Sequence, residues 1–193
     1  MEKWWPLIIV AIVVIIIVIL ASFIVTNYNK LVKQRNAVKN QFSQIDVQLN
    51  RRFDLIPNLV ETVKGYASHE EKILSKFAEA RTMFQKAHSS SDIKGLANAD
   101  AAFTAGFNAL VNAVKEQYPD LQANQNFQSL MATLKETEDK IAYQRQFYND
   151  VVNKYNNLRE LFPSNIVASM FKFEKADFFE ASETSRENVQ VKF

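Results

Sequence analysis

The sequence contains no cysteine and only two histidines among 193 residues. Without thiols it has no disulfide, no thiolate metal site and no lipoprotein attachment residue. Glycine and proline are also scarce, with three and four copies, against averages of about 7% and 5%. So few turn formers argue against strands joined by tight turns. The formal net charge of only +2 provides no basic field that would attract nucleic acid.

Recognisable catalytic motifs are missing as well. His69-Glu70 begins like the zinc-protease motif H-E-x-x-H, but Ile73 stands where the second histidine is required. Neither histidine has a glutamate three residues before it, so the E-x-x-H of di-iron bundles is absent too. No glycine-rich phosphate loop or nucleophile motif occurs. We therefore expect a protein that is not an enzyme and holds no cofactor or metal.

One long apolar run is present near the amino terminus. Nineteen residues from Leu7 to Val25 are apolar except Ser22 and include no charge, glycine or proline. As a helix this run measures about 28 Å, close to the hydrocarbon thickness of a bilayer. We expect a tail at residues 1–6 and a transmembrane helix at residues 7–25. A cleaved signal peptide is the alternative, but it requires a basic first region and a shorter apolar stretch.

The residues flanking this run predict its orientation. Trp4, Trp5 and Tyr28 lie at its two edges, where amphipathic rings favour the headgroup layer. Lys3 is the one basic residue before the run, whereas four follow it closely: Lys30, Lys33, Arg35 and Lys39. The positive-inside rule then predicts the amino terminus outside the cell and the following domain in the cytoplasm.

Residues 26–163 have the apolar spacing of amphipathic helices. The first stripe starts at Leu31 and continues to Val63, with Pro57 expected to kink it or begin a new first turn near Leu55. Ser68 and Glu71 form a capping box for a second helix, which a loop from His88 to Asp92 should close. Further stripes predict helices over about 93–118 and 124–162. Short connections favour an all-α, antiparallel, up-down-up-down four-helix bundle with long first and fourth helices.

Residues 164–193 are expected to form a short helix and a tail. Pro163 should end the fourth helix, and Ser164 is a candidate cap for a helix reaching Met170. An aromatic group follows: Phe171, Phe173, Phe178 and Phe179. Packing against the bundle is the favoured interpretation of these rings, and dipping into lipid is the alternative.

Charged residues interrupt the apolar stripes of the two long helices. If these helices are antiparallel and level at the membrane, facing residues have numbers that sum to about 190, at about 1.5 Å per residue. That register places Arg52 opposite Glu138, Asp46 opposite Arg145, and Arg35 opposite Tyr155 and Asn156. We expect cross-helix ion pairs, because an unpaired buried charge would cost several kcal/mol. Solvated side chains at a loosely packed seam are the alternative.

A polar stripe on the first helix is a candidate partner surface. Its carboxylates and amides could pair with Arg or Lys of another protein, although such stripes are usually just solvated faces. Its members are Asp46, Asn50, Asp54, Asn58 and Glu61.

Several motifs resemble the LemA family of bacterial membrane proteins. They include R-N-A-V-K-N (35–40), S-Q-I-D-V-Q-L (43–49), R-R-F-D-L-I-P-N-L-V-E-T-V-K-G-Y-A (51–67), Y-P-D-L (118–121), T-E-D-K-I-A (137–142) and F-P-S-N (162–165). The sequence departs from the family pattern at Asp139-Lys140, where Asn-Arg is expected. The resemblance implies a membrane helix followed by a helical bundle in the bacterial inner membrane. It also implies a link to HtpX-type membrane metalloproteases.

Two functions remain for the predicted molecule. The first is a non-enzymatic scaffold or adaptor, anchored in the bilayer and linked to membrane quality control, which binds another membrane protein. The second is a sensory or ligand-binding bundle that signals through the membrane helix. A pocket lined by Asp46, Arg52, Glu138 or Arg145 would favour the second. Neither the partner nor the oligomeric state follows from the sequence.

Overall fold

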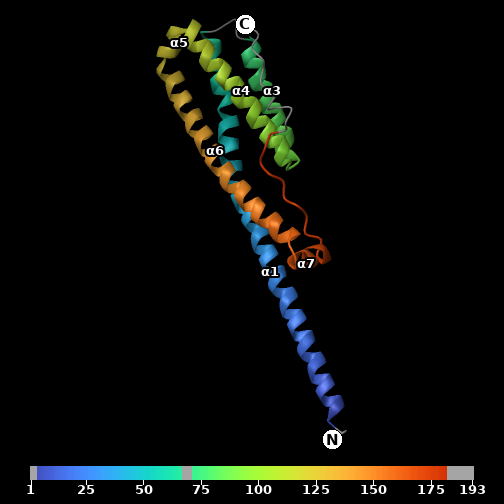
Figure 1. The fold of residues 1–193 in the computed structure, drawn as a ribbon. Coiled ribbons are helices and arrows are strands. Elements are labelled where there is room, and N and C mark those ends of the chain that lie inside the picture. The colour runs from blue at the N-terminus through green and yellow to red at the C-terminus, as the bar shows by residue number, and fades with distance from the viewer. Residues whose placement is uncertain (1–3, 67–70, 182–193) are drawn as a thin grey trace, which may run out of the picture. The chain divides into compact units, whose positions relative to one another are not determined.

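The structure is a computed structural model that describes residues 4–66 and 71–181. Within these residues all regular structure is helical, which confirms the all-α class (Figure 1). The helices are α1 (Trp5–Asp54), α2 (Ile56–Lys64), α3 (Glu71–Ser89), α4 (Ile93–Gln117), α5 (Pro119–Ala123), α6 (Gln125–Glu160) and α7 (Ser164–Met170).

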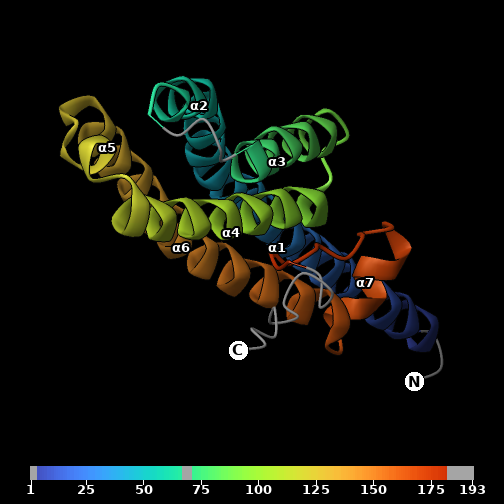
Figure 2. The same ribbon diagram turned by 90° about the horizontal axis from the view of Figure 1, so that it is seen from above.

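The chain divides into two compact units. The anchor unit consists of Met1–Asn40 and Asp150–Ala176, and the bundle unit consists of Gln41–Asn149 and Asp177–Phe193. α1 and α6 each contribute residues to both units. The up-down-up-down arrangement stays a prediction, although the three-residue connection between α3 and α4 makes these two helices antiparallel neighbours (Figure 2).

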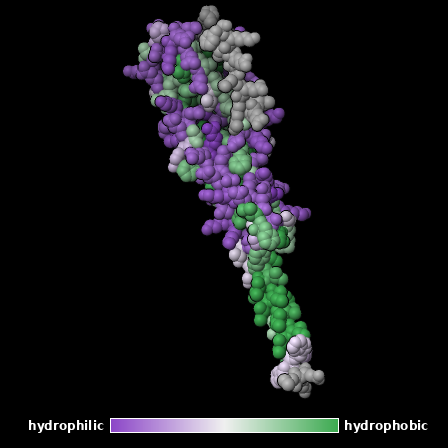
Figure 3. All heavy atoms as spheres, in the orientation of Figure 1, coloured by the Kyte–Doolittle hydropathy of each residue, from purple (hydrophilic) through white to green (hydrophobic). Residues whose placement is uncertain are grey.

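α1 contains the predicted membrane span. Between Leu7 and Ile56 no glycine or proline interrupts the helical hydrogen bonds, and α1 runs unbroken for 50 residues. Its most apolar window has a mean hydropathy of 3.7, and none of it is buried within the protein. This segment is the green stretch of Figure 3. The helix is long and apolar enough to cross a membrane.

Pro57 separates α1 from α2, as predicted. α1 ends at Asp54, and the Leu55 amide donates to the Arg52 carbonyl at 3.2 Å instead of continuing the α-helical pattern. α2 then begins at Ile56 with the proline in its first turn, where the missing N–H costs no helical hydrogen bond.

The connection between α3 and α4 differs from the prediction. α3 continues through His88 to Ser89, so only the last three residues of the expected loop lie outside a helix. Asp92 caps α4 by accepting a hydrogen bond from the Gly95 amide at 3.0 Å. A Cβ on Gly95 would lie 2.5 Å from the Asp92 carboxylate, so this cap requires glycine. Ser68 of the predicted capping box lies outside the described residues.

The ends of α4 and α6 follow the prolines. α4 ends two residues before Pro119, but Pro119 then starts the unpredicted single turn α5 because proline fits the first turn of a helix. α6 ends before Pro163, and α7 spans Ser164 to Met170 as predicted. Ser164 is not the cap of α7. It is the first helical residue, and its hydroxyl donates to the Leu161 carbonyl at 3.0 Å.

The tail that follows α7 is extended and is held by side chains of α6 in each unit. In the anchor unit, the side chain of Asn156 forms two hydrogen bonds with the backbone of Ala176, both at 3.0 Å. Its Nδ2 donates to the Ala176 carbonyl, and its Oδ1 accepts from the Ala176 N–H. The Tyr155 hydroxyl donates to the Glu174 carbonyl at 2.8 Å. Burial raises the pKa of Tyr155, which keeps this hydroxyl a donor.

The bundle unit uses the same pair of residue types. Asn149 donates to the Phe179 carbonyl at 3.5 Å and accepts from the Phe179 amide at 2.9 Å. The Tyr148 hydroxyl donates to the Asp177 carbonyl at 2.8 Å, and burial raises the pKa of this tyrosine too. The two Tyr-Asn pairs are seven residues apart on α6 and bind tail residues three apart.

Candidate functional site

Arg52 lies at the centre of the bundle unit and joins three helices. Its side chain is 1% exposed, although it belongs to the apolar seam of α1. The guanidinium pairs with Asp100 of α4 and with Glu138 of α6. It also lies 4.6 Å from the centre of the Phe103 ring, a cation–π arrangement. The structure thus brings together Arg52 and Glu138, the pair that the predicted register placed opposite each other.

Thr104 links the members of this charged cluster. Its hydroxyl donates to Glu138 at 3.2 Å and accepts from Arg52 at 3.4 Å. The Nε of Arg52 is buried and has no hydrogen-bond partner among the described residues. An unsatisfied buried donor costs about 1–3 kcal/mol. The ion pairs of Arg52 with Asp100 and Glu138 must offset this cost for the guanidinium to stay buried.

Two carboxylates share a single buried guanidinium in this cluster. Burial raises the pKa of Asp100, and the nearby charge of Arg52 opposes that rise without cancelling it. Burial likewise lowers the pKa of Arg52, while Asp100 acts in the opposite direction. The exposed Arg145 helps to hold the pKa of Asp100 down. Burial therefore opposes the charged forms of both Arg52 and Asp100, and their mutual attraction offsets only part of that cost.

The predicted pairing of Asp46 with Arg145 is not formed. The carboxylate of Asp46 lies 3.2 Å from His88 of α3, and it is not paired with Arg145. Asp46 is one position past the buried Ile45, and this offset turns it away from the seam toward α3.

Arg35 belongs to the anchor unit, where it lines a cavity together with Tyr155. Its guanidinium lies 5.2 Å from the Phe173 ring centre. The side chain of Asn156 donates a hydrogen bond to Ala176 of the tail and does not pair with Arg35. The predicted register considered only the two long helices, so it could not include the tail.

Asp100 and Thr104 were not among the predicted site residues. Asp100 is 4% exposed and lies one turn after Leu96 and one turn before Phe103 on the buried face of α4. A carboxylate within an apolar stripe was a usable signal, because a buried acid requires a cationic partner. Thr104 carried no comparable signal.

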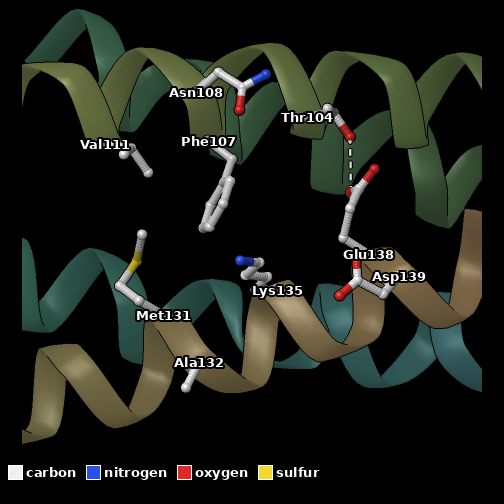
Figure 4. Close-up of a pocket in the computed structure, with 9 residues that line it drawn as sticks. All are labelled: Thr104, Phe107, Asn108, Val111, Met131, Ala132, Lys135, Glu138 and Asp139. Carbon is white, nitrogen blue, oxygen red and sulfur yellow. Dashed lines mark hydrogen bonds between the residues drawn. The ribbon is translucent and has the colours of Figure 1, made fainter.

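A cavity of about 550 Å³ opens beside this cluster, between α4 and α6 (Figure 4). We call it the α4/α6 cavity. Phe107 and Val111 of α4 face Met131 of α6 across it, and Glu138 lies at one end with its bond to Thr104. The complete lining is Thr104, Phe107, Asn108, Val111, Met131, Ala132, Lys135, Glu138 and Asp139.

The chemistry of the α4/α6 cavity suits binding more than catalysis. Its apolar part can remove an aliphatic or aromatic group from water, and Glu138 and Asp139 can pair with a cation at one end. Lys135 provides a charge of the opposite sign on the rim. Within residues 4–66 and 71–181, no group of three or more His, Asp or Glu side chains is arranged to hold a metal ion.

The polar stripe is largely accessible in the structure. Asp54 ends α1, and Asn58 and Glu61 lie on α2, with all three side chains exposed. Asn50 is half-buried, and its amide donates to the Asp46 carbonyl within the same helix at 2.8 Å. Three of the predicted surface residues are therefore available to a partner.

Comparison with known proteins gives concordant matches. The profile of the LemA family matches residues 41–193. Magnetosome protein MamQ 2 of Paramagnetospirillum magneticum is 29% identical over 187 residues, covering 83% of this chain and 68% of that protein. Protein LemA of Metamycoplasma hominis is 25% identical over 165 residues, covering 84% of this chain and 73% of its own length.

Proposed function

Because the chain belongs to the LemA family, we propose that this membrane-associated protein is an adaptor that docks an apolar segment of another membrane protein in the α4/α6 cavity. The main support for this proposal is the presence of the cavity itself. A bundle that served only as a spacer would gain stability by filling about 550 Å³ between two of its helices with side chains.

The shape and charge of the cavity favour a helical occupant. It is bordered by two helices, and the residues facing into it recur at helical spacing: Thr104, Phe107 and Val111 on one side and Met131, Lys135 and Glu138 on the other. Such a groove accepts the apolar anchors of an amphipathic helix. A basic residue one or two turns along the occupant would pair with Glu138 or Asp139.

The buried cluster supports this role by holding Glu138 in place. Arg52 and Thr104 both contact the Glu138 carboxylate, so its position does not depend on the occupant. A charge that is fixed in advance loses less conformational entropy when a partner binds. Arg52 thus connects the docking site to α1, the helix that contains the apolar span.

The apolar floor of the α4/α6 cavity provides the test. Met131→Asp and Val111→Asp place a carboxylate among apolar atoms at half-buried positions. We expect each variant to fold and remain in the membrane but to lose a partner that co-purifies with the wild type in mild detergent. Ala105→Asp is the matched control, because Ala105 is exposed on α4 and does not line the cavity. Equal recovery of the same partner with all three variants would contradict the proposal.

A sensory bundle is the second candidate, because the cavity is lined by Glu138 and Glu138 contacts Arg52 of α1. A small ligand that paired with Glu138 would weaken its contact with that helix. Native mass spectrometry of the wild type separates the two functions. A bound small molecule that is absent from Met131→Asp favours the sensor, and a stoichiometric protein partner favours the adaptor.

Partner identity and orientation are further parts of the proposal. The family resemblance favours an HtpX-type membrane protease, which would connect the adaptor to membrane quality control. The excess of basic residues after the span supports a cytoplasmic bundle in the bacterial inner membrane. Because the chain has no cysteine, Asn58→Cys creates a unique thiol. Labelling of that thiol by an impermeant maleimide in intact cells would contradict this orientation.

A further inference from the structure

The anchor unit exposes a cluster of large apolar side chains where α6 turns into α7. Leu161 is 64% exposed and Phe162 is 80% exposed. The remaining members are Ile166, Met170 and Phe171, each about half exposed. Scattered apolar residues are common on protein surfaces, but five exposed large apolar side chains within residues 161–171 indicate an interaction site.

The helical spacing of α7 produces part of this cluster. Ile166 and Met170 are four residues apart in α7, so they share one face. Phe162 lies in the turn that precedes α7. Another face of α7 is already used, because Val167 and Ala168 are buried at 0% and 2% exposure. α7 therefore has one apolar face buried against the protein and a second apolar face whose side chains, Ile166 and Met170, are more than half exposed.

The position of this cluster is determined by α1 within the same unit. The rings of Phe171 and Tyr28 lie 4.8 Å apart, centre to centre. Tyr28 comes three residues after Val25, the last residue of the apolar run, which is about 4.5 Å along the helix. The headgroup layer extends roughly 5–7 Å beyond the hydrocarbon on each side. If residues 7–25 span the hydrocarbon, Phe171 lies at about the depth of the headgroups.

Both ribbon views place α7 beside α1 (Figures 1 and 2). In Figure 3, apolar residues continue from the span into the part of the anchor unit that contains α7. The exposed cluster is thus adjacent to the surface that the span already presents to lipid.

The charge around the cluster also suits a membrane surface. Residues 26–40 and 150–176 contain eight basic and three acidic side chains. Arg35, Lys39, Lys172 and Lys175 line a cavity of about 440 Å³ together with one acid, Glu174. Lys175 is also 3.8 Å from Glu160. The excess positive charge next to apolar side chains favours anionic headgroups.

We propose that α7 is a second membrane contact, in which the face formed by Ile166 and Met170, together with Phe162 from the preceding turn, inserts into the interfacial layer beside the span. The occupant is the lipid bilayer itself, with the neighbouring basic residues facing anionic headgroups. A single helix leaves a protein free to rotate and tilt, whereas a second contact on one side restricts both motions. This contact does not depend on the α4/α6 cavity.

Spin labels on the full chain test this contact. The absence of cysteine makes Phe162→Cys, Ile166→Cys and Asn153→Cys unique labelling sites, and all three side chains are exposed. Asn153 is the matched control, a polar surface residue of α6 in the same unit. The labelled protein is reconstituted in vesicles of phosphatidylcholine and phosphatidylglycerol. Collision rates with oxygen, which concentrates in lipid, are compared with those of a water-soluble nickel chelate.

Insertion predicts that labels at 162 and 166 collide more with oxygen than with the chelate, and that the label at 153 shows the reverse. The nickel accessibility at 166 should rise when phosphatidylglycerol is omitted. Chelate access at 166 equal to that at 153 would overturn the proposal. A label at 166 that is immobilised and shielded from both reagents would overturn it as well, because a second copy or another protein would then cover this face.

Discussion

Arg51 and Arg52 are adjacent in the sequence but have opposite environments. Arg52 is buried against the Phe103 ring, whereas Arg51 is exposed. The sequence identified Arg52 because it interrupts an apolar stripe, and helical register alone indicated Glu138 as its partner. Asp100 could have been found by the same argument applied to α4. The cation–π contact with Phe103 could not have been predicted in this way, because the orientation of an aromatic ring depends on packing that sequence periodicity does not describe.

Arg52→Ala should lower the free energy of unfolding by about 3–5 kcal/mol, because it leaves Asp100 buried without its cation. Urea unfolding followed by circular dichroism in detergent measures this change. Arg51→Ala is the control and should change stability by no more than about 0.5 kcal/mol. Similar losses in the two variants would mean that Arg52 is not the centre of the cluster.

Asp100 predicts a specific pH dependence. Its raised pKa means that the folded protein binds this proton more tightly than the unfolded chain. Stability from this group is therefore present at low pH and decreases as pH rises through the interval that begins at its ordinary value of 3.8. The stability of the wild type relative to Asp100→Asn should fall over that interval. A difference that is constant or rises with pH would contradict the raised pKa.

At the scale of elements, the prolines and apolar stripes predicted most helix boundaries. Pro57 and Pro163 mark the ends of α1 and α6 because proline cannot continue a helix's hydrogen bonds. α5 was missed because a single turn is too short to show periodicity. The extended conformation of the tail was not predicted. Its backbone amides donate hydrogen bonds to the side chains of Asn149 and Asn156 and not to a neighbouring strand, and no spacing of residues in the sequence indicates such an arrangement.

Asn156 and Asn157 are adjacent, but only Asn156 is buried against the tail. Asn156→Ala removes both hydrogen bonds to Ala176, so exchange of the Ala176 amide should accelerate about tenfold. Hydrogen exchange with mass spectrometry or NMR measures this rate. Asn157→Ala should leave it unchanged, and equal protection in both variants would show that the tail is held by other contacts.

At the scale of the whole molecule, one helix contains both the apolar span and the arginine that contacts Glu138 of the α4/α6 cavity. The sequence was sufficient for a helix long and apolar enough to cross a membrane, for the all-α class and for the family, because hydropathy and motif order are properties of the chain itself. The α4/α6 cavity was not predicted. A cavity forms where the side chains of two helices do not fill the space between them, and the apolar spacing of a sequence does not describe that packing. The adaptor account depends on that void having a protein occupant.

Photocrosslinking in intact cells tests whether the α4/α6 cavity holds a protein partner. A photoreactive amino acid replaces Ala132 in the cavity or Asn58 in the polar stripe, and Ser129 on an exposed face of α6 outside the cavity serves as the control. The account predicts that the probe at 132 forms an adduct with a single membrane protein and that the probe at 129 does not. An adduct at 58 with the same protein would extend the docking surface to the stripe. Crosslinks confined to the chain itself at both 132 and 58 would contradict the adaptor account.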